Sequence, residues 1–337
     1  MKKLTSEQVK ALLNSPQQVV IVPHVNPDGD AVGSSLGLYH YLIQKGHKVS
    51  VIVPNDYPAF LKWIPGTENI IQFNTQRERA EEKLDAAELV FTLDFNALHR
   101  SGPMQEVLEE NNAIKIMIDH HQQPEDYANY TYSDVAMCST AEMVYHFIEQ
   151  MDDLAMMNKT IGAALYTGIM TDTASFRFPK TTSTTHRVVA HLMDLGVHHS
   201  DIHSKVYDAN RFERIKLLGV ALNNLTVLAD LNTAYITLSQ SELDQFGHQK
   251  GDTEGLVNYG LSVKGIKFAA IFIENKEEGI IKISLRSKGD FDVNLLAREH
   301  FNGGGHKNAA GGKSTLPLNE TIEKFEHLVR TLKTDLQ

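Results

Sequence analysis

The sequence predicts an α/β protein: a mostly parallel-sheet N-terminal domain, a smaller α/β C-terminal domain, and a cleft between them. Short apolar runs alternate with helical periodicity through the first half, which is typical of a parallel sheet. The sequence then becomes polar and helix-rich before further strand-like runs follow. The chain has 337 residues, enough for two hydrophobic cores. We therefore expect a first domain over 1–190, a helical connector over 191–222 and a second domain over 223–337.

Four apolar runs in the first half predict buried strands. They are QQVVIVPH (17–24), KVSVIVP (48–54), ELVFTLDF (88–95) and AIKIMIDHH (113–121). Helical periodicity predicts helices at 31–46, 139–151 and 158–173. Continuous apolar runs bounded by polar turns, with helices between them, indicate strands that are covered on both faces of the sheet.

The second half predicts a smaller sheet with its own helices. Strands are expected at 233–239, 267–275 and 279–287, with a polar hairpin turn at 274–279. Helices are expected at 292–301 and, as an amphipathic C-terminal segment, at 318–336.

Composition limits the classes of function. Lys and Arg total 32 and Asp and Glu total 42, a net charge of −10, which argues against a protein that coats long nucleic acid through many phosphate contacts. The single cysteine excludes an internal disulfide and favours a reducing compartment. The N-terminus has no long apolar region of a signal peptide, and no run of 18 apolar residues occurs. We expect a cytoplasmic protein without a membrane partner; a homodimer stays open.

Acidic and histidine side chains follow three predicted strands and one predicted helix. The residues are His24, Asp28, Asp30, Asp94, Asp119, His120, His121 and Asp172. The carboxyl ends of parallel strands lie along one sheet edge, where α/β proteins bind ligands. We therefore expect these side chains to converge.

Carboxylates and imidazoles without a thiolate favour Mn²⁺, Mg²⁺ or Fe²⁺ over a thiolate zinc site. The number of carboxylates suggests two ions, with a residue such as Asp94 bridging them. Two ions about 3.5–4 Å apart can clamp the attacking and leaving oxygens of a phosphoryl transfer.

Each of these residues also has an ordinary structural interpretation. Asp28 and Asp30 could form a turn and cap a helix, and Asp94 could cap the following turn. One of the adjacent histidines could lie in the core or at the surface. Asp172 could be a helix-end acid. Chance alone explains the set poorly, since four separate segments would have to deliver such residues to one edge.

A glycine-rich stretch, HFNGGGHKNAAGGKS (300–314), is the second unusual feature. Glycines let a backbone approach a ligand, and exposed N–H groups can bind an anion. We expect Gly303, Gly304, Gly305 and His306 to contact substrate, together with Arg286 at the end of a predicted strand. The alternative is a flexible surface loop. The stretch fits neither a Walker A motif nor a Rossmann fingerprint.

Arg177 stands between Phe176 and Phe178, shortly after Asp172. The aromatic rings could stack on a base and Arg177 could meet a phosphate. A strand with an alternating buried face is at least as good an interpretation of this stretch.

These motifs together resemble the DHH phosphoesterase family. HVNPDGD, LDF, IDHH and YTGIMTDTASF resemble its four N-terminal motifs in order, and FNGGGHKNAAGG resembles the signature of the DHH-associated C-terminal domain. Ala174 departs from the pattern, since the family often has glycine there. Length and domain content resemble the group of oligoribonucleases that also dephosphorylate 3′-phosphoadenosine 5′-phosphate (pAp), also called nanoRNases.

The resemblance implies a role for each residue. His24, Asp28 and Asp94 would bind one Mn²⁺, and Asp30, Asp94, His120 and Asp172 the second, with Mg²⁺ as an alternative ion. Catalysis would involve His121 at the scissile phosphate, supported by Asp119. The glycines, His306 and Arg286 would hold the terminal phosphate or the base.

The implied function is a manganese-dependent phosphoesterase that degrades short oligoribonucleotides to mononucleotides and dephosphorylates pAp. The alternative is a phosphodiesterase for linear dinucleotides (pApA or pGpG) in cyclic-dinucleotide turnover. A pyrophosphatase is a more distant alternative, because this chain resembles that group only in its N-terminal motifs. A non-catalytic nucleotide sensor is disfavoured, because a pure binder does not need so many metal-type side chains.

Overall fold

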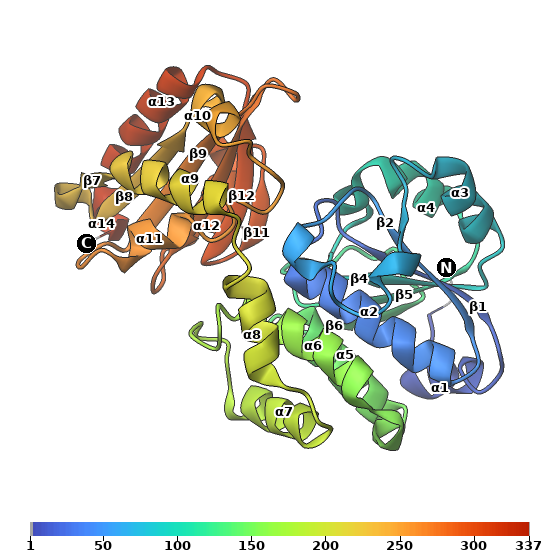
Figure 1. The fold of residues 1–337 in the computed structure, drawn as a ribbon. Coiled ribbons are helices and arrows are strands. Elements are labelled where there is room, and N and C mark those ends of the chain that lie inside the picture. Colours follow the sequence, from blue (N-terminus) through green and yellow to red (C-terminus); the bar gives the residue numbers. More distant parts are fainter. Residues whose placement is uncertain (1–2, 337) are drawn as a thin grey trace. The chain divides into compact units, whose positions relative to one another are not determined.

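The computed structural model describes residues 3–336, which form two compact units divided between residues 209 and 210 (Figure 1). Helices α7 (Ser183–Asp194) and α8 (His199–Tyr207) belong to the first unit. Helix α9 (Phe212–Asn223) belongs to the second. The helices expected as a connector are thus divided between the two units.

The first unit is built on a six-stranded sheet in which every neighbouring pair is parallel. The spatial order is β3 (Ile71–Gln72), β2 (Lys48–Val53), β1 (Gln18–Pro23), β4 (Leu89–Leu93), β5 (Ile114–Asp119) and β6 (Tyr130–Ser133). The chain order reverses between β1 and β4, so this is the switch point of the sheet. The predicted parallel N-terminal sheet is confirmed.

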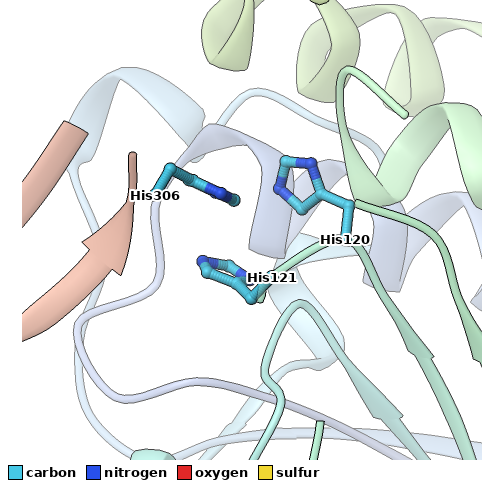
Figure 2. A group of neighbouring side chains, drawn as sticks. All are labelled: His120, His121 and His306. Carbon is cyan, nitrogen blue, oxygen red and sulfur yellow. The ribbon is translucent and has the colours of Figure 1, made fainter. Parts of the chain in front are cut away.

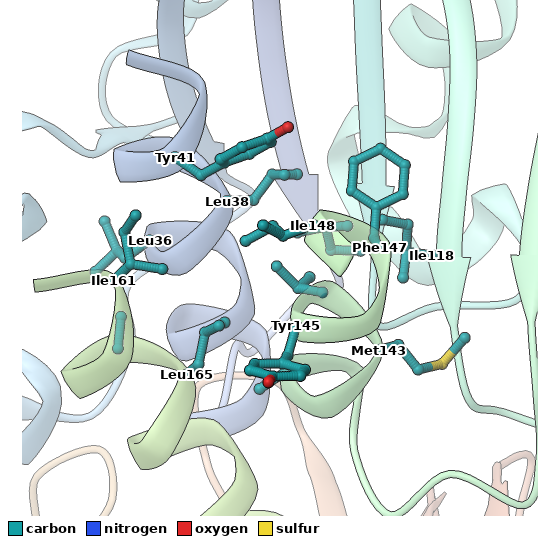
Figure 3. Close-up of a cluster of buried hydrophobic side chains, with 14 of the residues drawn as sticks. Leu36, Leu38, Tyr41, Ile118, Met143, Tyr145, Phe147, Ile148, Ile161 and Leu165 are labelled. Atoms are coloured by element: carbon teal, nitrogen blue, oxygen red, sulfur yellow. The ribbon is translucent and has the colours of Figure 1, made fainter. Parts of the chain in front are cut away.

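Both faces of this sheet are covered, which explains the continuous apolar strands. Along β1, Val19 and Ile21 enter one core and Val20 and Val22 the other. The first core contains side chains of α2 (Gly29–Gln44), α5 (Thr140–Gln150) and α6 (Lys159–Asp172) (Figure 3). The second contains side chains of α3 (Arg77–Asp85), the 3-10 helix η3 (Leu98–Met104) and α4 (Gln105–Glu110).

The two outer strands carried too weak a pattern to be predicted. β3 has only two residues, and β6 has three half-buried positions and one exposed position at the sheet edge. The N-terminal helix α1 (Ser6–Leu12) begins at Thr5, which forms a capping box with Gln8.

Helices α2 and α6 approach each other closely along the face of α2 that carries Gly33, which we call the glycine face. A Cβ atom on Gly33 would lie 2.6 Å from the carbonyl oxygen of Ala164 and 2.8 Å from the amide nitrogen of Gly168. Those atoms belong to the backbone of α6, so neither can move without displacing the helix. This contact brings the first turn of α2 beside the last turn of α6.

Helix α6 ends in a Schellman motif with alanine where glycine is usual. The Ser175 N–H donates to the Met170 carbonyl at 2.8 Å, and the Ala174 N–H donates to the Thr171 carbonyl at 3.2 Å. The φ angles of Ala174, Ser175 and Phe176 are 48°, 62° and 65°, a left-handed turn of three non-glycine residues. Such residues each cost roughly 1–2 kcal/mol, so the segment following Asp172 is strained.

The second unit contains a six-stranded mixed sheet. Its order is β11 (Gly304–His306), β12 (Ala309–Ser314), β10 (Ile280–Ser287), β9 (Phe268–Asn275), β8 (Thr233–Leu238) and β7 (Thr226–Leu228), with only β8 and β9 parallel. One core contains α12 (Val293–His300), α13 (Leu318–Thr331) and α14 (Lys333–Leu336). The other contains α9, α10 (Gln240–Gln245) and α11 (Val257–Ser262). The expected α/β C-terminal domain is confirmed.

Among the described residues, none of the helices combines the length and apolar character needed to cross a membrane.

The close approach of α2 and α6 gives a first prediction. Gly33→Ala should lower the free energy of unfolding by about 1–3 kcal/mol, because the added methyl group meets backbone atoms. Gly219→Ala is the control, since no atom lies within 4 Å of a Cβ atom there and it also lies within a helix. That variant should be unchanged or up to about 1 kcal/mol more stable. Urea unfolding of both variants tests the contact, and equal effects would contradict it.

The left-handed turn gives a second prediction. Ala174→Gly should raise the free energy of unfolding by about 0.5–1 kcal/mol, because glycine removes the αL penalty but adds entropy to the unfolded chain. Ala163→Gly, inside the same helix, should lower it by a similar amount or more. If the turn is formed in solution, thermal unfolding should show stability changes of opposite sign in the two variants. A loss of stability in Ala174→Gly would mean that it is not.

Candidate metal centre

The register of three neighbouring strands brings the predicted residues to one edge. Pro23 of β1 pairs with Leu93 of β4, and Leu93 pairs with Ile118 of β5. The next residue on each strand is therefore His24, Asp94 and Asp119, side by side at the switch point of the sheet. The expectation of convergence is met by the geometry of these three segments.

Helix α2 supplies Asp28 and Asp30 to the same place. Asp28 is the N-cap of α2, and its Oδ1 accepts the N–H groups of Asp30 and Ala31 at 3.0 and 3.1 Å. The same oxygen lies 3.9 Å from His24 Nε2. The capping interpretation of Asp28 is therefore correct, and it is compatible with a place in the centre, because one carboxylate can do both.

Asp94 lies in the middle of the group with its two oxygens facing different partners. Its Oδ2 is 3.3 Å from His24 Nε2, and its Oδ1 is 3.5 Å from His120 Nε2. His120 Nε2 is also 3.5 Å from Asp172 Oδ2 and 3.8 Å from Asp30 Oδ2. Two candidate ligand sets, His24–Asp28–Asp94 and Asp30–His120–Asp172, thus meet at one carboxylate, Asp94.

The two ligand histidines present a neutral nitrogen to the centre. The Nδ1 atoms of His24 and His120 lie 2.8 and 3.2 Å from the carbonyl oxygens of Val25 and Met137, so each Nδ1 carries the proton. Burial lowers the pKa of His24, and it lowers the pKa of His120 to about 4. Each Nε2 therefore keeps its lone pair for a metal ion at neutral pH.

The carboxylates fit a cation that is bound between them. Asp30 and Asp94 are 1% and 2% exposed. Burial, and then repulsion from neighbouring carboxylates, raises the pKa of both well above the usual value. Asp119 Oδ2 is buried and has no hydrogen-bond partner among residues 3–336. Buried, mutually repelling oxygen donors with neutral imidazoles are the donor set that hard divalent cations bind.

Helix α5 adds support that the sequence did not reveal. The backbone N–H groups of Thr140 and Ala141, in the first turn of α5, donate to the two oxygens of Asp30 at 2.6 and 2.8 Å. The Thr140 hydroxyl donates to Asp94 Oδ1 at 2.9 Å. The positive end of the helix dipole also favours these carboxylates. Thr140 was missed because a Ser-Thr pair at a helix start, here Ser139 and Thr140, signals only a cap.

His121 faces a different way from His120 although the two are adjacent. The rings project from the segment after β5 and are T-shaped, with centroids 5.1 Å apart (Figure 2). His121 Nδ1 lies 2.7 Å from Asp119 Oδ1 and 3.7 Å from Asp94 Oδ1. Asp119 is fully buried, so it holds the His121 ring in one orientation. This arrangement leaves His121 Nε2 as the nitrogen that is turned away from Asp119.

The segment after Asp172 does not form the alternating strand that was one interpretation of it. That alternative is wrong, because residues 174–176 form the left-handed turn. The Phe176 ring packs against Tyr166 and His186, with centroids 6.0 and 5.7 Å apart. Arg177 is exposed, and its Nε donates to the Ala174 carbonyl.

The remaining predicted residues lie in the second unit. Arg286 on β10 and His306 at the end of β11, which is also drawn in Figure 2, both pair with Ala309 on β12. They therefore occupy one row across three strands. Gly303, Gly304 and Gly305 form or precede β11 rather than a flexible loop. A Cβ atom on Gly303 would lie 1.9 Å from the Gly311 carbonyl oxygen, so glycine is needed there for strand pairing.

Two family models match the chain in order. The DHH family, N-terminal domain, matches residues 18–169, and the DHHA1 domain matches residues 232–336. The first range contains every residue of the candidate metal centre except Asp172. The second range contains the row of Arg286 and His306.

Known proteins resemble the whole chain. The bifunctional oligoribonuclease and PAP phosphatase NrnA of Thermus thermophilus is 30% identical over 99% of this chain and 94% of that protein. The crystal structure of an exopolyphosphatase-related protein from Bacteroides fragilis has a TM-score of 0.93 at 40% identity, covering 98% of this chain and 97% of that chain.

A more distant structure shares the fold. RecJ of Thermus thermophilus, in complex with Mn²⁺, has a TM-score of 0.56 at 14% identity, covering 98% of this chain and 55% of that one. The full-length relative and the two matched domains confirm the resemblance inferred from the motifs. The chain belongs to the DHH family and is a metal-dependent phosphoesterase with a DHHA1 domain.

Proposed function

We propose that the protein is a manganese-dependent phosphoesterase that degrades short oligoribonucleotides to mononucleotides and dephosphorylates pAp. One observation carries the two-ion part of the proposal. The oxygens of Asp94 face two separate groups of ligands, Oδ2 toward His24 and Oδ1 toward His120. A carboxylate in that position can bridge two cations, which is the arrangement used for phosphoryl transfer.

The ligand sets follow from the same geometry. His24, Asp28 and Asp94 would hold one ion, and Asp30, Asp94, His120 and Asp172 the other. Bound divalent cations would neutralise charge on the phosphoryl oxygens and lower the pKa of a coordinated water. Oxygen and imidazole donors without a thiolate fit Mn²⁺, with Mg²⁺ as an alternative ion. The Mn²⁺ complex of a protein that shares the fold agrees with this choice.

The catalytic side chains of the chain itself would be His121 and Asp119. Asp119 Oδ1 accepts a hydrogen bond from His121 Nδ1–H, which fixes the tautomer and leaves the lone pair on Nε2, the nitrogen that would meet the phosphate. Because Asp119 is fully buried, the imidazole would be held in place before substrate arrives.

The substrate class is supported by the full-length relative, whose name gives both oligoribonuclease and PAP phosphatase activity. In the second unit, Arg286, His306 and the glycines 303–305 are proposed to bind the terminal phosphate or the base. Arg286 offers a bidentate fork for a phosphate. The N–H of Gly305 is engaged by Asn294 Oδ1 at 2.8 Å, so it is not free for an anion. Arg177 is exposed and is proposed only as an outer phosphate contact.

The like-charged carboxylates give a prediction for metal binding. In wild-type protein, each Mn²⁺ bound at 100 times its Kd should stabilise the fold by about 2.7 kcal/mol. Asp172→Asn should remove most of that gain and lower turnover by about 100-fold or more. Without metal it should be as stable as wild type or more stable, because Asp172 repels Asp30 and Asp94.

Thermal unfolding in EDTA and in Mn²⁺ measures these effects, with Asp85→Asn on the exposed end of α3 as the control. The pH dependence has a defined sign. Because the folded-state pKa values of Asp30 and Asp94 are raised, metal-free protein should lose stability as pH rises through them. An Asp172→Asn variant that is stabilised by Mn²⁺ as much as wild type would refute the ligand set.

The substrate proposal is tested by product analysis. Purified protein with Mn²⁺ is given pAp, 5′-labelled pApA, pyrophosphate and polyphosphate in parallel, each with an EDTA control. We expect metal-dependent release of phosphate from pAp and of mononucleotide from pApA, with pyrophosphate untouched. The ratio of the two rates separates the scavenging of short RNA, or of linear dinucleotides, from the removal of pAp.

Other outcomes would replace the proposal. Hydrolysis of polyphosphate alone would move the assignment toward the description of the Bacteroides fragilis structure. Hydrolysis of pyrophosphate alone would contradict the role proposed for the second unit. Binding of nucleotide without any turnover would favour a sensor.

A further inference from the structure

Lys180 is a cation near the candidate metal centre that none of the motifs contains. It lies in the segment between α6 and α7, two residues before Thr182, the N-cap of α7. The Thr181 N–H donates to the Phe178 carbonyl at 3.0 Å and closes this segment into a turn. Lys180 is partly buried, and no ion pair or hydrogen bond of its ammonium is found within residues 3–336. Asp172 and Asp119 are among the charges that act on it.

Arg100 is a second such cation, and it comes from the His24 side of the ligand sets. It belongs to η3, and its carbonyl accepts the Val25 N–H at 2.8 Å, next to His24. The chain also packs closely at Gly102, where a Cβ atom would lie 3.0 Å from Val25 Cγ2. The guanidinium makes no ion pair or hydrogen bond with another described residue, although its charge acts on His24, Asp119 and His121.

Besides burial, the charges of both Arg100 and Lys180 act on the same side chain, His121, and lower its pKa. They come from different segments, one after β4 and one after α6. A partly buried cation without an anion is unfavourable, and burial accordingly lowers the pKa of Lys180. A site that retains such an unfavourable, unpaired cation is a candidate for binding an anion.

The net charge of the centre indicates what the two cations could do there. Five carboxylates contribute to it: Asp28, Asp30, Asp94, Asp119 and Asp172. Two divalent cations would leave one negative charge, which would repel a phosphate. Arg100 and Lys180 reverse the sign of the centre and make it attractive to an anion.

We propose that Arg100 and Lys180 bind the phosphoryl group next to His121, so that the first unit has its own phosphate site beside the metal ions. The inference rests on the two-ion function proposed above. It adds two substrate-binding residues to that function and requires no contribution from the second unit.

The experiment measures orthophosphate binding to the full-length, Mn²⁺-loaded protein by calorimetry, below the solubility limit of manganese phosphate. Lys180→Gln and Arg100→Gln should each weaken phosphate binding by about tenfold or more, because a charge-assisted hydrogen bond is lost. Lys180→Arg should retain most of the affinity. Lys159→Gln on α6 and Arg79→Gln on α3 are matched controls, since both residues are exposed, and they should bind as wild type does.

Binding of Mn²⁺ is the second measurement, because it separates a phosphate ligand from a support of the metal site. Both glutamine variants should bind Mn²⁺ as tightly as wild type or more tightly, since a positive charge near the carboxylates is removed. Unchanged phosphate affinity, or Mn²⁺ affinity that falls in parallel with it, would overturn the proposal.

Turnover of pAp is measured on the same variants. The value of kcat/KM should fall by about tenfold or more in each glutamine variant and not in the controls. If wild-type protein binds orthophosphate with the expected losses but hydrolyses no nucleotide, the phosphate site stands and the substrate proposal fails. If nucleotide is hydrolysed and the variants keep full phosphate affinity, the reverse holds.

Discussion

Asp30 and Asp94 are like-charged carboxylates buried in one metal centre, and much of the first unit can be understood as the means of holding them there. Each carboxylate is almost fully buried and is repelled by its neighbours. Two N–H groups at the start of α5 and the Thr140 hydroxyl offset part of that repulsion. Bound divalent cations would compensate the rest, and stability and function would then be coupled at the same atoms.

The register of the sheet and the packing of two helices give the centre its precision. β1, β4 and β5 are neighbours, and equivalent positions at their ends supply His24, Asp94 and Asp119. The glycine face of α2 lets α6 come close enough to place Asp172 opposite His120. A sheet edge built in this way is rigid, because every strand that contributes is covered on both faces.

Strand ends were predictable from the sequence because an apolar run that stops at an acid or a histidine marks both the end of a strand and a candidate ligand. Asp94 and His120 are examples, and family motifs then assigned them to ligand sets. β6 was missed because its alternation is weak, and the strained turn at 174–176 was missed because Ala, Ser and Phe do not signal αL. Thr140, Arg100 and Lys180 lie outside the motifs. Only tertiary contacts, which a single sequence does not display, bring them to the centre.

The glycines of the second unit show why residue type and role must be argued separately. The stretch 303–305 suggested an anion site, yet Gly303 is required by the approach of the Gly311 carbonyl, and the Gly305 N–H is bound by Asn294. Close strand pairing thus accounts for two of the three glycines without a ligand. What remains for recognition is the row in which Arg286 and His306 both oppose Ala309. In the proposed function this row binds the terminal phosphate or the base, and a site with so few cations would favour short substrates over long ones.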